Sequence, residues 1–128
     1  MPKWLETGFK EYEKRIKGQC QLIEIQSNIP KRLECFLKDD FHDIKLDAHG
    51  IMFSSDELAA KIKNWQIQSV NVNFYIGGAD GHHTCVQNGC KESWSLSKNT
   101  YPHHLVKVML IEQIYRSIMI LKNHPYHK

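Results

Sequence analysis

The sequence has no apolar run close to the roughly 18 residues that a membrane-spanning helix needs. Its first residues, Met1–Glu6, lack the charged and then apolar order of a signal peptide. Neither a low-complexity tract nor a repeat of fixed period occurs along the chain. These absences argue against an integral membrane protein and a solenoid, and we expect a cytoplasmic protein with no membrane partner.

The sequence lacks a CxxC pair among its four cysteines. A chain of this size does not need disulfides to hold its core, so we expect reduced thiols. Neither Cys85 nor Cys90 lies in a local signature of a nucleophile. The pairs His82–His83 and His103–His104 can supply zinc ligands, but neither has zinc-finger or HExxH spacing. We expect no bound metal. The four cysteines are Cys20, Cys35, Cys85 and Cys90.

The length of 128 residues predicts one domain, residues 1–128, and the 41% of hydrophobic and 24% of charged residues are typical of a globular protein. The formal charge of +3 is mild but unevenly distributed. Residues 98–128 hold five bases and one acid, a balance of +4, together with four histidines. This excess is typical of a site for a phosphate-bearing partner, although an ordinary solvated surface also accounts for it.

Apolar residues at helical spacing predict four helices, and short apolar runs predict four strands. A capping box formed by Ser54 and Glu57 marks the start of the third helix. The second strand is predicted to end at Asp47–Gly50. Strands that alternate with helices predict an α/β fold with a mostly parallel sheet covered on both faces. The helices are expected at 2–16, 30–37, 54–65 and 102–121, and the strands at 20–25, 44–46, 70–76 and 94–96.

Two loops follow predicted strands. Ligands of parallel sheets bind beyond the carboxyl ends of the strands, so we expect Gly77–Gly81 and Ser97–Tyr101 to meet at one site. Glycine lets a backbone approach a ligand closely. The spacing is not the GxGxxG of a dinucleotide-binding fold, however, and a glycine turn is often only structural.

The C-terminal end carries residues suited to chemistry. Arg116 can bind a phosphate or carboxylate bidentately, or it can be an ordinary surface arginine. If the tail is ordered, His127 supplies a base near neutral pH and Tyr126 an aromatic face for a nucleotide. Chain ends are usually frayed, so the sequence alone leaves this role open.

Several linked motifs, in order along the whole chain, give the sequence a resemblance to a known family. It resembles the RlmH family of the SPOUT superfamily, whose members methylate a pseudouridine in large-subunit ribosomal RNA. The motifs lie at Pro2–Tyr12, Leu46–Gly50, Ser54–Ala59, Ile76–Gly81, Trp94–Val106, Glu112–Arg116 and His124–His127.

The resemblance implies an α/β fold with a mostly parallel sheet flanked by helices and a C-terminal trefoil knot. It implies that S-adenosylmethionine is held in that knot. It also implies a homodimer in which the C-terminal tail of one subunit completes the site of the other. The cofactor-binding residues that it implies are Leu46, Gly77, Gly78, Leu96, Ser97, Lys98, Asn99, Thr100 and Tyr101.

The same resemblance implies methyl transfer to ring nitrogen 3 of the pseudouridine, whose imide proton must leave. His127 is the candidate for assisting that loss, and Tyr126 for stacking on or orienting the base. Arg116 is the candidate for holding a phosphate or steering the tail.

The chain departs from the family pattern in three places. It lacks the usual first strand before the Pro2 segment, and its stretch between Ile25 and Leu46 is shorter than usual. Lys107 stands where the family often has arginine. These departures keep a second class open, a non-catalytic relative that binds RNA or the ribosome.

Overall fold

The structure is a computed structural model that describes residues 2–18, 22–27, 41–77, 84–97, 99 and 101–123, without the side chains of residues 27, 41, 84, 85 and 88. The predicted helix at 30–37 lies outside these ranges. None of the described helices is both long enough and apolar enough to cross a membrane. The elements are, in order, α1 (Lys3–Lys17), β1 (Ile23–Ser27), β2 (Phe41–Met52), α2 (Ser55–Gln68), β3 (Asn71–Ile76), α3 (Thr84–Gly89), β4 (Glu92–Ser95) and α4 (His103–Leu121).

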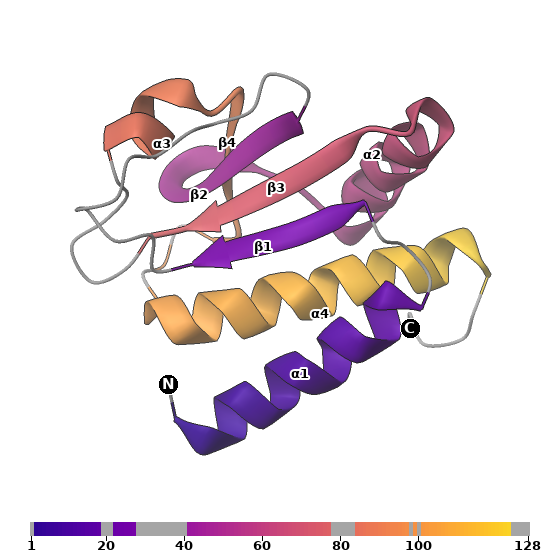
Figure 1. Ribbon diagram of the computed structural model, residues 1–128, viewed down its shortest axis with the longest axis horizontal. Coiled ribbons are helices and arrows are strands. Elements are labelled where there is room, and N and C mark those ends of the chain that lie inside the picture. The colour runs from indigo at the N-terminus through magenta and orange to yellow at the C-terminus, as the bar shows by residue number, and fades with distance from the viewer. Residues whose placement is uncertain are drawn as a thin grey trace.

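The described strands form one sheet in the order β1-β3-β2-β4, and all neighbouring strands are parallel (Figure 1). The α/β fold predicted from the alternation of helices and strands is therefore confirmed. Ser54 caps α2 as predicted, because its hydroxyl accepts a hydrogen bond from the Glu57 amide while the Glu57 carboxylate accepts one from the Ser54 amide.

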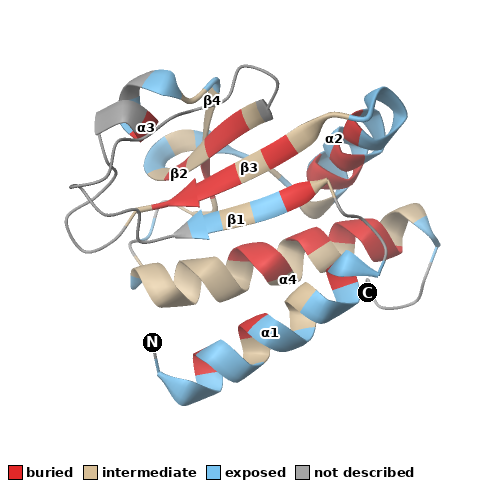
Figure 2. Ribbon diagram, in the orientation of Figure 1, coloured by how far each residue is buried: buried red, intermediate tan, exposed pale blue. Residues whose placement is uncertain are grey.

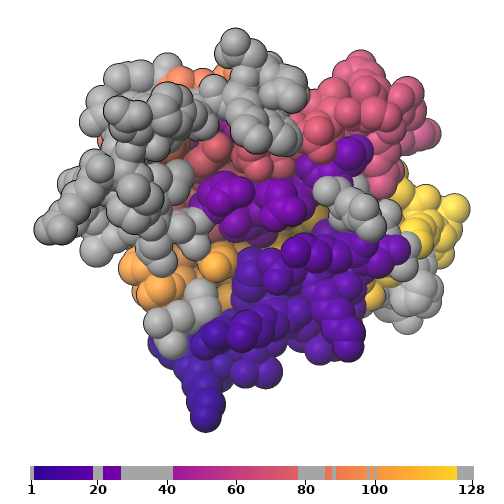
Figure 3. All heavy atoms as spheres, in the orientation of Figure 1, coloured from indigo at the N-terminus to yellow at the C-terminus, as the bar shows by residue number. Residues whose placement is uncertain are grey.

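Helices cover both faces of the sheet, as predicted. On one face α4 contacts both α1 and α2 (Figure 1), and Figure 3 shows that α1 crosses α4 and leaves both ends of α4 visible. On the other face Lys45, whose neighbours Ile44 and Leu46 point into the core, donates a hydrogen bond to the carbonyl of Gln87 in α3. The sequence did not predict α3, because six residues are too few to show a helical period.

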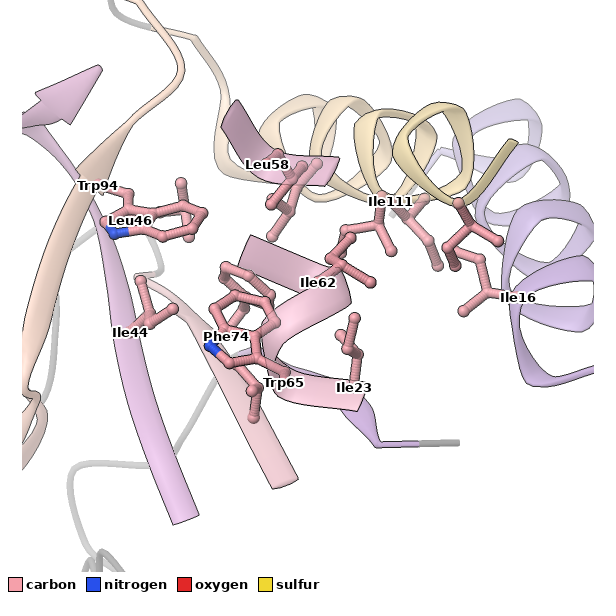
Figure 4. Packing of buried hydrophobic residues seen from close by; sticks show 14 of the residues in the cluster. Ile16, Ile23, Ile44, Leu46, Leu58, Ile62, Trp65, Phe74, Trp94 and Ile111 are labelled. Atoms are coloured by element: carbon pink, nitrogen blue, oxygen red, sulfur yellow. The ribbon is translucent and has the colours of Figure 1, made fainter. Parts of the chain in front are cut away.

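The core lies between the sheet and the helices α1, α2 and α4. Alternate residues of β3 belong to it, and Figure 4 shows Phe74 near side chains of α2 such as Ile62 and Trp65. Figure 2 shows the buried residues of these elements in red. Trp94 stacks on Trp65 at 6.0 Å between ring centroids and meets the Phe74 ring edge-on at 5.7 Å. Each large apolar side chain buried in this way stabilises the fold by about 1.5–3 kcal/mol.

The prediction that the second strand ends at Asp47–Gly50 is wrong. Strand β2 continues to Met52, because residues 47–50 bulge out between two stretches that pair with the same residue of β4. Both Leu46 and Ile51 lie opposite Trp94. The amide of His49 donates to the carboxylate of Asp47 and closes the bulge.

Gly50 lies where β2 passes closest to β4. A Cβ atom at this position would lie 2.6 Å from backbone atoms of Ser93 and of Trp94, closer than real Cβ contacts allow. The atoms in the way belong to a paired strand and cannot swing aside as a flexible side chain would. Glycine is therefore the residue that this crossing requires.

A polar cluster joins the first residues of β2 and β4. Glu92 binds His42, accepts a hydrogen bond from the Trp94 indole at 3.0 Å, and lies 3.8 Å from the Lys61 amine. Burial alone would raise the pKa of Glu92, but the hydrogen bonds from Trp94 and His42 and the charge of Lys61 outweigh it and lower that pKa below its usual value. The carboxylate thus stays charged and ties the two strands together.

Replacing Gly50 by alanine should destabilise the protein by about 3 kcal/mol or more, because overpacking against backbone atoms cannot relax by a change of rotamer. The free energy of unfolding in urea measures the effect. The matched control is Gly8→Ala in α1, where a Cβ would meet no atom within 4 Å. Alanine there should stabilise the helix by about 0.5–1 kcal/mol. Equal effects at the two positions would contradict the close approach at Gly50.

Candidate active site

The carboxyl ends of β3 and β4 lie at one edge of the sheet, on either side of Leu46, the last residue of β2 before its bulge. Leu46 lies opposite Ile76 of β3 and opposite Trp94 of β4. Gly77 follows β3 directly, and Leu96 follows β4. The starts of the two predicted loops therefore leave the sheet at the same edge, on either side of β2.

Hydrogen bonds within the second loop fix its described part. The hydroxyl of Ser95 donates to the carbonyl of Ser97 at 2.7 Å, and the amide of Asn99 donates to the Ser97 hydroxyl at 3.1 Å. Hydrogen bonds with Ser97 and Asn99 also lower the pKa of the Tyr101 phenol. The described part of this loop thus presents hydroxyl and amide groups and one aromatic ring that hydrogen bonds hold in place.

A groove of about 590 Å³ runs along the outer side of α4. This volume is within the range of small-molecule sites and interface clefts. Leu96 of the predicted cofactor loop lines the groove together with the β2–α2 junction, Tyr12 of α1 and residues of α4. Its walls are apolar and aromatic along most of their length and polar at Ser54, Ser55, Glu112 and Gln113. The full lining is Tyr12, Phe53, Ser54, Ser55, Leu96, Val108, Met109, Glu112 and Gln113.

Arg116 is held by a residue of this groove. Its Nε donates to Oε1 of Glu112 at 3.0 Å, and its Nη2 donates to the same oxygen. The side chains are only 27% exposed for Arg116 and 20% for Glu112. The guanidinium of Arg116 is thus bound to a carboxylate of its own helix, and its contact with a ligand stays a prediction.

Several predicted site residues lie outside the described part of the chain. These are the candidate base and its aromatic neighbour in the tail, one glycine of the first loop and two residues of the second. Their placement stays a prediction. They are His127, Tyr126, Gly78, Lys98 and Thr100.

The described residues contain no group of three or more metal-ligating side chains. The rings of His103 and His104 lie 3.9 Å apart between centroids at the start of α4. Cys90 is a free thiol whose pKa is raised to about 11 by burial and by the charge of Asp43. A thiol that is protonated at neutral pH is a weak nucleophile.

The sequence reasoning missed three polar residues next to the groove, Ser55, Gln113 and Glu112. Ser55 donates its hydroxyl to Oε1 of Gln113 at 2.6 Å, and Nε2 of Gln113 donates to Oε2 of Glu112 at 3.3 Å. The spacing of Glu112 and Arg116, four residues apart on a predicted helix, was the signal available for part of this network. No spacing could have indicated Ser55, which lies 58 residues from Gln113.

Residues 1–127 match a family model described as "Predicted SPOUT methyltransferase". The chain belongs to the SPOUT methyltransferase family. It is 40% identical to the ribosomal RNA large subunit methyltransferase H of Saccharophagus degradans, over 100% of this chain and 93% of that protein. It is 38% identical to the protein of the same name from Francisella philomiragia, over 99% of this chain and 92% of that protein. The protein of the same name from Xanthomonas campestris pv. campestris is 34% identical, over 99% of this chain and 92% of that protein.

The resemblance to the RlmH family is thus confirmed along the whole chain. The family match includes both loops at the carboxyl edge, α4 and most of the tail, since it runs to residue 127. The position of a site at this edge of the sheet and the roles of single residues remain predictions.

Replacing Ser97 by alanine should loosen the second loop, because the Asn99 amide loses its acceptor. A net hydrogen-bond contribution of about 0.5–1.5 kcal/mol corresponds to a roughly two- to tenfold faster hydrogen exchange of that amide. Nuclear magnetic resonance measures the rate residue by residue. Ser97→Thr retains the hydroxyl and serves as the control. An unchanged exchange rate of Asn99 in the alanine variant would show that Ser97 does not hold the loop.

Proposed function

We propose that this protein methylates large-subunit ribosomal RNA, that it uses S-adenosylmethionine, and that the acceptor is ring nitrogen 3 of a pseudouridine. The supporting observation is the family match over residues 1–127, together with relatives that are 34–40% identical over nearly their whole length and are named ribosomal RNA large subunit methyltransferase H. On this proposal residues 1–128 act as a single SPOUT-type domain, with the trefoil knot of that fold, in the cytoplasm where ribosomes are found.

The residues at the carboxyl edge fit S-adenosylmethionine. Gly77 has no side chain to obstruct a ligand at the end of β3, and Leu96 offers a half-buried apolar contact. Ser97, Asn99 and Tyr101 present hydroxyl, amide and aromatic groups from a loop that hydrogen bonds already fix. We propose these residues as the described part of the cofactor site, with Leu46 beside them and Gly78, Lys98 and Thr100 completing it.

When bound, S-adenosylmethionine supplies a methyl group carried by a sulfonium sulfur. The ring nitrogen would bond to that methyl carbon in line, and the sulfur would leave as a neutral thioether. The chain has two tasks, to align the acceptor ring and to take up its N3 proton. We assign the second task to His127, because a neutral imidazole is a base near neutral pH. We assign Tyr126 to stacking on the base and Arg116 to binding an RNA phosphate or steering the tail.

Incubation of ribosomes with the protein and labelled S-adenosylmethionine, followed by mass spectrometry of the ribosomal RNA, tests this function. His127→Ala should lower kcat by about 10²–10⁴, the usual contribution of a general base. The wild-type rate should rise with pH as an imidazole that must be neutral loses its proton, and the variant should lack that rise.

The exposed Lys63 on α2 provides a control, since Lys63→Ala changes neither loop nor tail. Methylation by His127→Ala at the wild-type rate would overturn the assignment of the base. Ribosome binding by the wild-type protein without any methyl transfer would support the second class, a non-catalytic relative that binds RNA or the ribosome.

We infer that the working form is a homodimer whose second copy covers the groove. Residues in the first half of α4 are partly exposed although many are apolar, and Figure 2 shows them in tan. A helix with apolar side chains both toward the core and away from it needs a second covering surface. Leu105, Val108 and Met109 are the partly exposed apolar residues in question.

Light scattering should give a mass of about 30 kDa, twice the 15.0 kDa of one chain. Met109→Lys, which places a charge in the groove, should shift the mass toward one chain. The matched control is Ile67→Lys, at a residue of α2 that is 71% exposed. A dimer unchanged by Met109→Lys, or a wild-type protein of 15 kDa at micromolar concentration, would contradict this interface.

A further inference from the structure

A chain of hydrogen bonds runs from the start of α2 to Arg116 in the second half of α4. The Ser55 hydroxyl donates to Oε1 of Gln113 at 2.6 Å, so the oxygen of this amide faces α2. Its nitrogen, Nε2, therefore faces Glu112 and donates to Oε2 at 3.3 Å. The Ser117 hydroxyl, with its single proton, lies 2.8 Å from the Gln113 carbonyl and 3.2 Å from the Ser55 carbonyl and shares its hydrogen bond between them, which links the two helices.

The other carboxylate oxygen of Glu112, Oε1, accepts from Nε and Nη2 of Arg116. The two oxygens of Glu112 thus have different partners, Gln113 on one side and Arg116 on the other. A carboxylate held at both oxygens cannot rotate without breaking one of these contacts. The direction of the guanidinium along α4 is therefore set from α2.

The chain contains a second glutamate–arginine pair at the same spacing, which shows what is particular about this one. Glu11 and Arg15 on α1 also pair across four residues, at 2.9 Å. Their side chains are 58% and 47% exposed, against 20% and 27% for Glu112 and Arg116. Exposed pairs of this kind contribute little, because water screens them and both side chains remain mobile.

A long arginine side chain loses about 2 kcal/mol of rotamer entropy when it is immobilised. If Arg116 binds an RNA phosphate, as the proposed function has it, a protein that has already fixed the guanidinium spares the complex that cost. We propose that Glu112, oriented by Gln113 and Ser55, is a positioning residue that holds Arg116 in place for the ribosomal RNA. This assignment rests on the proposed function and adds Glu112 and Gln113 to it.

Glu112→Gln tests the assignment, because glutamine keeps the size of the side chain and removes the charge. We expect the KM for ribosomes to rise roughly tenfold with kcat changed less than twofold, the signature of a lost binding contribution. In an Arg116→Ala background the same change should have no further effect. Glu11→Gln on α1 is the matched control and should leave KM at the wild-type value.

A structural readout accompanies the kinetics. The Nε–H of Arg116 should exchange with solvent measurably faster in Glu112→Gln than in the wild-type protein, as followed by nuclear magnetic resonance without RNA. Gln113→Leu, which removes the donor to Glu112 Oε2, should show the same two effects at a smaller size. It serves as the second variant should Glu112→Gln fold poorly.

Three outcomes decide whether Glu112 positions Arg116 and whether the proposed function holds. An unchanged KM in Glu112→Gln, or an equal loss in the Arg116→Ala background, overturns the positioning role, because the residue would then act only on the packing of α2 and α4 or not at all. A wild-type protein that transfers no methyl group overturns the proposed function and this assignment with it. A KM effect that depends on the presence of Arg116, with faster exchange of its Nε–H, supports the assignment.

Discussion

At Gly50 the backbone of β2 lies against the backbone of β4, and the arrangement of the candidate site depends on that approach. A Cβ there would lie 2.6 Å from Ser93 and Trp94 backbone atoms, so any other residue would push the strands apart. The approach lets β2 pair with β4 before and after its bulge, since Leu46 and Ile51 both lie opposite Trp94. It thereby places the start of the loop at Leu96 beside the ends of β2 and β3.

Trp94, at the close approach of β2 and β4, belongs both to the core and to the strand that leads to the candidate site. Trp94 pairs with β2 through its backbone, while its ring stacks on Trp65 and meets Phe74. Its indole nitrogen also donates to Glu92, which binds His42 at the other end of the contact between the strands. The packing that stabilises the fold is thus the packing that fixes the end of β4, so the loop after it begins from a rigid position.

Much of the fold could be predicted from local patterns. The helical spacing of Leu5, Phe9 and Ile16 gave α1, and the capping box at Ser54 gave the start of α2, because these signals reflect interactions between residues close in sequence. The end of β2 could not be predicted in this way. The residues Asp47–Gly50 have the composition of a turn, and only the pairing of Ile51 and Met52 with a strand some forty residues later continues the strand.

In the candidate site, too, features set by local sequence could be predicted and features set by contacts between distant residues could not. The two loops were predicted to meet at one site, because the carboxyl ends of parallel strands lie at one edge of a sheet. The register of Leu46 with Ile76 and Trp94 places the first residues after β3 and β4 at the same edge. The partners of Arg116 were not found. Glu112 is one helical turn away and detectable in principle, but its orientation comes from Ser55, which only the packing of α2 on α4 brings near.

The character of α4 links these observations. A helix that only covers a sheet has one apolar face, yet α4 has buried residues such as Leu110 and Ile114 on one side and half-exposed Val108 and Met109 on another. The polar residues of its second half, Glu112 and Gln113, lie on that outer side, where they line the groove. The outer side of α4 is therefore an apolar surface that ends in a fixed ionic pair. Such a surface suits a partner that brings apolar side chains to the first half of the helix and an anionic ligand to the second.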